Sequence, residues 1–166
     1  SPAIKHVSEY HLVLKFGDVD VERMYFLEEM IATYFYDDEE IESKTGVLKQ
    51  DWKVRRTPRF LFLSIERKRF SQTKKRTVKL RTPVYFPSEL DLQQLGVLDD
   101  GFVGHSKFSL QGFACFAGSD NNGHYTSYVK HPSSKQFVFH SNDGRPPKKM
   151  PSPTWIANLN VVQSVC

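Results

Sequence analysis

The stretch NNGHYTSYVK, residues 121–130, decides the fold that this sequence predicts. An apolar, β-prone run at residues 108–117 precedes it, and a loop of Gly, Ser, Asn and Asp at residues 118–123 connects the two. Two β-prone runs joined by such a loop predict a β-hairpin, with the return strand at residues 125–130. His124 opens the return strand at the sheet edge, where it can face a cleft. Imidazole can take and return a proton near neutral pH, although a lone histidine at a loop end commonly contacts only water.

Three motifs, in matching order and spacing, resemble those of the ubiquitin-specific protease family. The first is FSLQGFACFAG (residues 108–118) followed by GHYTSYV (residues 123–129), which resembles the histidine box of that family. The second, PRFLFLSIER (residues 58–67), resembles its segment of a proline, a buried strand and an arginine. The third is Lys79 followed by VYFPSELDL (residues 84–92), which is similar to its segment of a lysine, Phe-Pro and Leu-Asp-Leu.

The resemblance covers about residues 26–143 and is to the C-terminal half of a ubiquitin-specific protease domain. The cysteine box that opens that domain is not in this chain. The resemblance implies an α+β, papain-like fold with palm and fingers regions, in which residues 1–166 form one domain with an antiparallel β-sheet and one main helix. It also implies two partners, which are ubiquitin or ubiquitinated proteins and the N-terminal, cysteine-carrying half of the same protease.

The composition agrees with one folded domain. A chain of 166 residues with 39% apolar content can bury a sizeable core, and 13 Phe and 7 Tyr suit the faces of a sheet. The 2 cysteines argue against a disulfide framework and favour a reducing compartment, the cytoplasm or the nucleus. The lack of a long apolar stretch and of a signal-peptide pattern predicts a soluble protein that does not bind membranes. The net charge of +4 permits contact with nucleic acid but does not demand it.

Two periodicities predict the elements near the N-terminus. Apolar and polar residues alternate over residues 10–16, which predicts a strand with one buried face. Residues 22–35 follow a helical period, with Asp20 as the N-cap and with Glu28 and Glu29 on the solvated side. The apolar stripe of this helix comprises Met24, Leu27, Ile31, Tyr34 and Phe35.

Shorter patterns predict the connecting elements. Residues 60–65 are apolar on both faces, as in a central strand that is covered on both sides. Residues 46–56 predict a short hairpin, residues 89–95 one helical turn and residues 99–101 a turn. Further strands are expected at residues 137–139 and 159–165.

No metal or cofactor is predicted. In many members of the resembled family the fingers region carries paired Cys-x-x-Cys zinc ligands, and a structural zinc needs four Cys or His ligands. No cysteine lies near residues 46–56, so we predict no zinc there. The acidic run at residues 36–42 is either a solvated connector or a complement to the basic surface of ubiquitin, the substrate that the resemblance implies.

The most basic stretch, residues 67–81, has two interpretations. Such a run could contact phosphate backbones or serve as a nuclear signal. Apolar residues interrupt it at strand-like spacing, however, and Phe70 is the only aromatic residue on which a base could stack. We therefore favour a solvent-exposed hairpin with charged outward faces over a nucleic-acid site.

A cysteine protease needs a thiolate, a histidine that shares and returns its proton, and a third group that orients the imidazole. His124 fits the second role. The resemblance implies an Asn or Asp roughly 15–20 residues later in the third role, and Asn142 and Asp143 match it. One extra residue leaves their alignment ambiguous, and Asn142 is favoured over Asp143. Without the resemblance, an ordinary Asn-Asp-Gly turn is the alternative.

Neither cysteine fits the nucleophile. Cys115 lies in the middle of an apolar strand, where a small buried hydrophobic side chain is expected, and Cys166 ends the chain. Three explanations follow. The chain is a fragment or processed half of a full protease, the other half is a separate chain, or the protein is an inactive relative that still binds ubiquitin.

The resemblance also implies substrate contacts. Gly123 allows close approach of the backbone, and Tyr125 lines a narrow groove that admits the Gly-Gly tail of ubiquitin. Phe116 stands where the family often has a histidine near the substrate channel. The predicted function is the C-terminal portion of a thiol-dependent deubiquitinase that cleaves after the C-terminal glycine of ubiquitin. The alternative is a catalytically inactive module that binds ubiquitin or acts as a scaffold.

Overall fold

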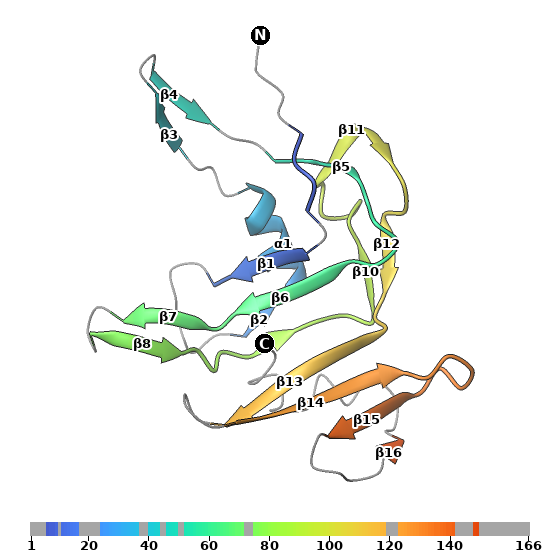
Figure 1. The fold of residues 1–166 in the computed structure, drawn as a ribbon. Helices are drawn as coiled ribbons and strands as arrows, with labels where there is room; N and C mark the ends of the chain where they lie inside the picture. Colours follow the sequence, from blue (N-terminus) through green and yellow to red (C-terminus); the bar gives the residue numbers. More distant parts are fainter. Residues whose placement is uncertain are drawn as a thin grey trace.

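The computed structural model describes residues 6–9, 11–16, 24–36, 40–43, 46–49, 52–71, 75–118, 123–141 and 148–149 (Figure 1). Within these residues there is one helix, α1 (Leu27–Tyr36), among short strands. The strands are β1 (His11–Lys15), β2 (Tyr25–Phe26), β3 (Glu40–Ser43), β4 (Gly46–Lys49), β5 (Val54–Arg56), β6 (Phe62–Glu66), β7 (Lys68–Ser71), β8 (Arg76–Lys79), β9 (Val84–Tyr85), β10 (Glu89–Asp91), β11 (Leu98–Val103), β12 (Lys107–Ser109), β13 (Gly112–Gly118), β14 (Gly123–Lys130), β15 (Phe137–Ser141) and β16 (Lys148–Lys149). The fold is therefore α+β, as the sequence predicts.

The largest sheet is antiparallel and has the strand order β13-β14-β15-β16. It lies at the end of the molecule away from β3 and β4 (Figure 1). The predicted hairpin is confirmed, because β13 and β14 pair from Gly112 with Val129 to Gly118 with Gly123. The predicted strand at residues 108–117 is two strands, however. The amide of Leu110 donates to the Ser88 carbonyl, so β12 stays with β10 while β13 turns into the larger sheet.

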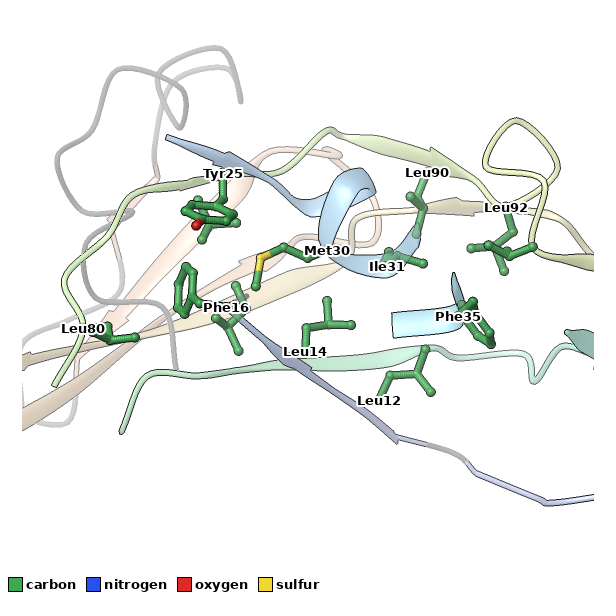
Figure 2. Close-up of a cluster of buried hydrophobic side chains, with 13 residues drawn as sticks. Leu12, Leu14, Phe16, Tyr25, Met30, Ile31, Phe35, Leu80, Leu90 and Leu92 are labelled. Carbon is green, nitrogen blue, oxygen red and sulfur yellow. The ribbon is translucent and has the colours of Figure 1, made fainter. Parts of the chain in front are cut away.

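The main core lies between α1 and the strands around it. Ile31 of α1 and Leu14 of β1 are fully buried, and Met30 is 3% exposed. Figure 2 shows these side chains turned toward one another, with Leu90 and Leu92 closing the other side of the helix. The predicted alternation at residues 10–16 is confirmed by the burial of Leu12 and Leu14 between exposed neighbours.

Three strand pairs are parallel, whereas the sequence analysis expected only an antiparallel sheet. They are β1 with β6, β2 with β9, and β5 with β11. Parallel partners need long crossover connections, so their pairing joins segments that lie far apart in the sequence. Two of these pairs contact the helix, because β1 and β2 pack against α1.

The helix begins later than predicted. Residues 22–35 were expected to be helical, but Tyr25–Phe26 form β2 and α1 starts at Leu27. The amide of Tyr25 donates to the Pro83 carbonyl at 3.0 Å, so this segment joins a strand pair instead of the helix. Met24 is consequently 51% exposed and not part of the apolar stripe. The predicted N-cap, Asp20, lies outside the described residues.

The solvated face of the helix is also smaller than predicted. Glu29 is exposed, but Glu28 is half-buried, because β1 and β2 pack against α1 from two sides.

The strand predicted at residues 60–65 is not covered on both faces. Phe60 and Phe62 are 58% and 64% exposed, whereas Ile65 is buried. Among the strands described, β6 pairs with β1 and carries core residues on one side. An apolar run alone does not distinguish a doubly covered strand from one with an exposed apolar face.

Three connecting elements also differ from their predictions. The hairpin near residues 46–56 is formed instead by β3 and β4, while β5 pairs with β11. The helical turn expected at residues 89–95 begins as β10 and becomes a turn only after Asp91. The turn expected at residues 99–101 lies inside β11. In each case pairing with a distant strand overrides the local preference.

The basic hairpin is confirmed. β7 and β8 pair antiparallel, and the side chains of Lys68, Arg69 and Arg76 are exposed. Arg67 departs from the prediction, since it is 4% exposed. Its guanidinium donates to the Thr82 carbonyl at 2.7 Å and to the Leu80 carbonyl at 3.3 Å.

Candidate active site

His124 lies near the start of β14, beside the end of the hairpin. It is paired across the sheet with Ala117 of β13 and is half-buried. Its Nε2 atom lies 2.6 Å from the Oγ atom of Ser141, the last residue of β15. Thr126 is the direct cross-strand partner of Ser141, so the His124–Ser141 contact is a diagonal one on the same face of the sheet.

The face that carries His124 continues into a small core. Two residues further along this face Thr126 is half-buried, and two further still Tyr128 is buried. Tyr128 stacks on Phe113 with ring centroids 4.7 Å apart, and burial raises the pKa of its hydroxyl. Burial on this face therefore decreases from Tyr128 to Thr126 and His124, and His124 lies near the start of the strand.

Cys115 belongs to this small core. It is 2% exposed and clusters with Tyr128 and Phe137, so its predicted role as a buried hydrophobic residue is confirmed. The thiol lies inside the packing of the sheet. The other cysteine, Cys166, lies outside the described residues.

The predicted substrate-binding residues gather on the opposite face of the sheet. Phe116 pairs with Tyr125, and their ring centroids are 4.8 Å apart. The ammonium group of Lys79 lies 3.7 Å from the centre of the Phe116 ring. Gly123 belongs to this group, because a Cβ atom at that position would collide with the ring of Phe116.

The two groups of predicted site residues are therefore separated by the sheet. Successive side chains of a strand point to opposite faces, so His124 and Tyr125 cannot share one face. The last pair of the β13–β14 ladder before the hairpin loop is Gly118–Gly123, next to His124, so both faces can be reached at this end of the hairpin. Whether Gly123, Tyr125 and Phe116 contact substrate stays a prediction.

The predicted third members of the site, Asn142 and Asp143, lie outside the described residues, and their role stays a prediction. Ser141 was not predicted, because an amide or carboxylate side chain was expected in the third role. The signal was available in the spacing, since Ser141 follows His124 by 17 residues. A hydroxyl can also accept or donate a hydrogen bond to an imidazole.

The arrangement can support acid–base chemistry at one ring nitrogen. With Nε2 held by Ser141, the Nδ1 atom of His124 is left for a reacting group, and no described residue is hydrogen-bonded to it. A histidine fixed at one nitrogen and open at the other is what a cysteine or serine nucleophile requires of its base. Within the described residues, no cluster of three or more His, Cys, Asp or Glu could hold a metal ion. No helix of the described part is long and apolar enough to cross a membrane.

The chain matches a family of known proteins. The sequence model of the family described as "Ubiquitin carboxyl-terminal hydrolase" matches residues 12–149. Chicken ubiquitin carboxyl-terminal hydrolase 2 is 34% identical over 96 residues, which are 57% of this chain and 25% of that protein. Its human counterpart is 32% identical over 87 residues, which are 52% of this chain and 14% of that protein. The chain thus spans a quarter or less of these relatives.

Solved structures of the SAGA DUB module have a similar fold. A structure of the yeast SAGA DUB module has a TM-score of 0.66 at 19% identity and covers 92% of this chain and 33% of that one. The Ubp8/Sgf11/Sus1/Sgf73 DUB module of SAGA bound to ubiquitin aldehyde also has a TM-score of 0.66, at 18% identity, and covers 92% and 33%. At these identities the likeness is one of fold.

Proposed function

This chain belongs to the ubiquitin carboxyl-terminal hydrolase family and is part of a ubiquitin-specific protease domain, and from this premise we propose that it carries the general base of a deubiquitinating cysteine protease. In this proposal His124 takes the proton of a cysteine thiol and later returns it to the leaving amine. The enzyme cleaves the bond that follows the C-terminal glycine of ubiquitin. The nucleophilic cysteine comes from sequence outside these 166 residues.

One observation carries the proposal: Nε2 of His124 is held by Ser141, and no residue of the described part is hydrogen-bonded to Nδ1. A base that is held in one orientation stays in line with its nucleophile, and this placement is what makes proton transfer efficient. The cysteine of the described part, Cys115, is buried in the sheet packing and is excluded as the nucleophile by its position.

Ubiquitin is the proposed substrate and partner. The support is the family itself and the similar fold of the SAGA DUB module, which was solved with ubiquitin aldehyde. We place the ubiquitin tail at the hairpin end, where the face of His124 meets the face of Gly123, Tyr125 and Phe116. The second proposed partner is the cysteine-carrying half of the same protease.

A binding module without catalysis is the second candidate. Two observations favour it. The cysteine that the structure describes is buried, and Phe116, at a position where the resembled family often has a histidine, is packed between Tyr125 and Lys79. In that case the domain would bind ubiquitin without cleaving it.

Hydrolysis of a fluorogenic amide of the ubiquitin C-terminus by the full-length natural protein distinguishes the two candidates. The proposal predicts that kcat falls by roughly 10²–10⁴-fold in His124→Ala. His140→Ala is the matched control, because His140 is an exposed histidine on β15 whose side chain lies on the other face. Binding of ubiquitin without hydrolysis by the wild-type protein would select the module instead.

A further inference from the structure

We propose that Ser141 is the residue that positions His124, so that a hydroxyl performs the orienting role for which the sequence suggested Asn142 or Asp143. The inference deepens the proposed function and rests on it. It concerns how the base is held, and none of the resemblances to known proteins assigns it.

The contact is short and its partners are held by the sheet. The Oγ atom of Ser141 lies 2.6 Å from Nε2 of His124. The β14–β15 ladder runs from Lys130 with Phe137 to Thr126 with Ser141, so it fixes the backbone of Ser141 up to the point of contact. Only one side-chain torsion of Ser141 then remains to be set, and the hydrogen bond sets it. The contact is also partly buried, so water competes with it less than at an exposed position.

The chemistry of a hydroxyl suits this role in both protonation states of the ring. A base that acts through Nδ1 must carry its neutral-state proton on Nε2, and Nε2–H then donates to Oγ of Ser141. When the thiol proton moves to Nδ1, the thiolate forms and the imidazolium still donates from Nε2 to the same oxygen. The hydrogen bond to Ser141 therefore persists through the transfer, and no bond to Ser141 is made or broken.

A merely structural contact would behave differently. If the bond only tied β14 to β15, its loss would lower stability and leave the chemistry of the surviving folded protein unchanged. A positioning role predicts instead a change in the tautomer of His124 and in kcat, with KM little affected.

The first test is ¹⁵N NMR of the imidazole nitrogens, which reports the tautomer of His124 without any substrate. We expect the wild-type protein to hold its neutral-state proton on Nε2, and Ser141→Ala to give a mixture of the two tautomers. Ser141→Thr, which keeps the hydroxyl, should restore the wild-type signals. The signals are assigned with His124→Gln, and Ser127→Ala is the matched control, because Ser127 is a half-buried serine on β14 whose side chain lies on the other face.

The second test is hydrolysis of the fluorogenic ubiquitin amide by the same variants of the full-length protein. Ser141→Ala should lower kcat by roughly 10-fold, which is a part of the roughly 10²–10⁴-fold that a positioned base contributes. Its KM should stay within about twofold of the wild-type value. Asn142→Ala and Asp143→Ala should lower kcat by less. The inference is overturned if Ser141→Ala leaves the tautomer unchanged, or if either neighbouring substitution costs more than Ser141→Ala. An inactive wild-type protein would count against the proposed function, and the NMR result would then decide the contact between Ser141 and His124 by itself.

Discussion

Gly123 is the residue whose identity the hairpin depends on most closely. Its backbone conformation does not require glycine, but the ring of Phe116 occupies the space in which a side chain would begin. That ring is in turn held by Tyr125 and by the ammonium group of Lys79. The absence of a side chain at Gly123 therefore makes room for an aromatic ring of its own sheet.

Gly123→Ala should consequently destabilise the fold. We expect a loss of about 1–3 kcal/mol, typical of adding a carbon to a filled space, measured by urea-induced unfolding. The same substitution in a Phe116→Leu background should cost clearly less, since the smaller side chain leaves room. Equal losses in both backgrounds would show that Phe116 is not the obstacle.

Tyr34 gives a prediction about pH. Its hydroxyl donates to Glu9 at 2.7 Å, and burial, followed by this hydrogen bond, raises its pKa from 10.0 to about 12. Because the folded state prefers the neutral phenol, the stabilisation is complete below pH 10 and is lost as the pH rises from about 10 to about 12.

Tyr34→Phe should therefore lose less stability than the wild-type protein over that alkaline range. Unfolding measured at several pH values from about 9 to about 12 tests this, because the series begins about one unit below the usual pKa of tyrosine. Parallel curves for the two proteins would contradict the assignment.

The residues of the candidate site differ in how well the sequence predicted them. His124 was placed correctly at the start of the return strand, because glycine-rich loops and strand periodicity are local signals. Ser141 was not predicted, because its role depends on the register between β14 and β15, which no local pattern contains.

At the scale of elements, the β7–β8 hairpin is anchored by Arg67. This buried side chain donates to the carbonyls of Leu80 and Thr82, and its guanidinium lies 5.5 Å from the ring centre of Phe16. A charge in this position is stable only because its hydrogen bonds replace the water it has lost. The exposed basic residues of the same hairpin have no such constraint.

Arg67→Met should destabilise the fold by about 2–4 kcal/mol, because buried carbonyl groups lose their donor. The measurement is the thermal unfolding midpoint together with urea unfolding. Lys68→Met on the neighbouring exposed position is the control and should change stability by about 0.5 kcal/mol or less. Similar effects of the two substitutions would contradict the anchoring role.

The elements predicted least well were those whose ends are set by pairing with a strand far away in the sequence. The helix was expected from residue 22, but Tyr25–Phe26 pair with Val84–Tyr85 and leave the helix to start at Leu27. The helical period of the sequence continues through Tyr25. Tyr25 nevertheless adopts a strand conformation, in which its amide donates to the Pro83 carbonyl and its side chain is buried. Hairpins such as β7–β8 and β13–β14 were predicted correctly, because both of their partners are close in sequence.

At the scale of the whole molecule, the chain has one large core around α1 and a smaller one within the β13–β16 sheet. The α+β class followed from the family resemblance, and the strand-like alternation at residues 10–16 and the single helical stretch agreed with it. The three parallel strand pairs could not be predicted, since a parallel register is set by tertiary packing between remote segments.

The chain corresponds to only part of the proteins that it matches. The chain spans a third of the solved chains to which its fold is similar and a quarter or less of the curated relatives. The proposed activity therefore has to be measured on the full-length natural protein.

The most direct measurement is covalent capture of that protein by ubiquitin whose C-terminus carries a thiol-reactive group. The proposal predicts an adduct whose rate of formation falls by roughly 10²–10⁴-fold in His124→Ala. It also predicts that the adduct persists in Cys115→Ser, because that thiol is buried. An adduct that forms at the wild-type rate without His124, or a folded wild-type protein that binds ubiquitin and forms none, would contradict the proposal.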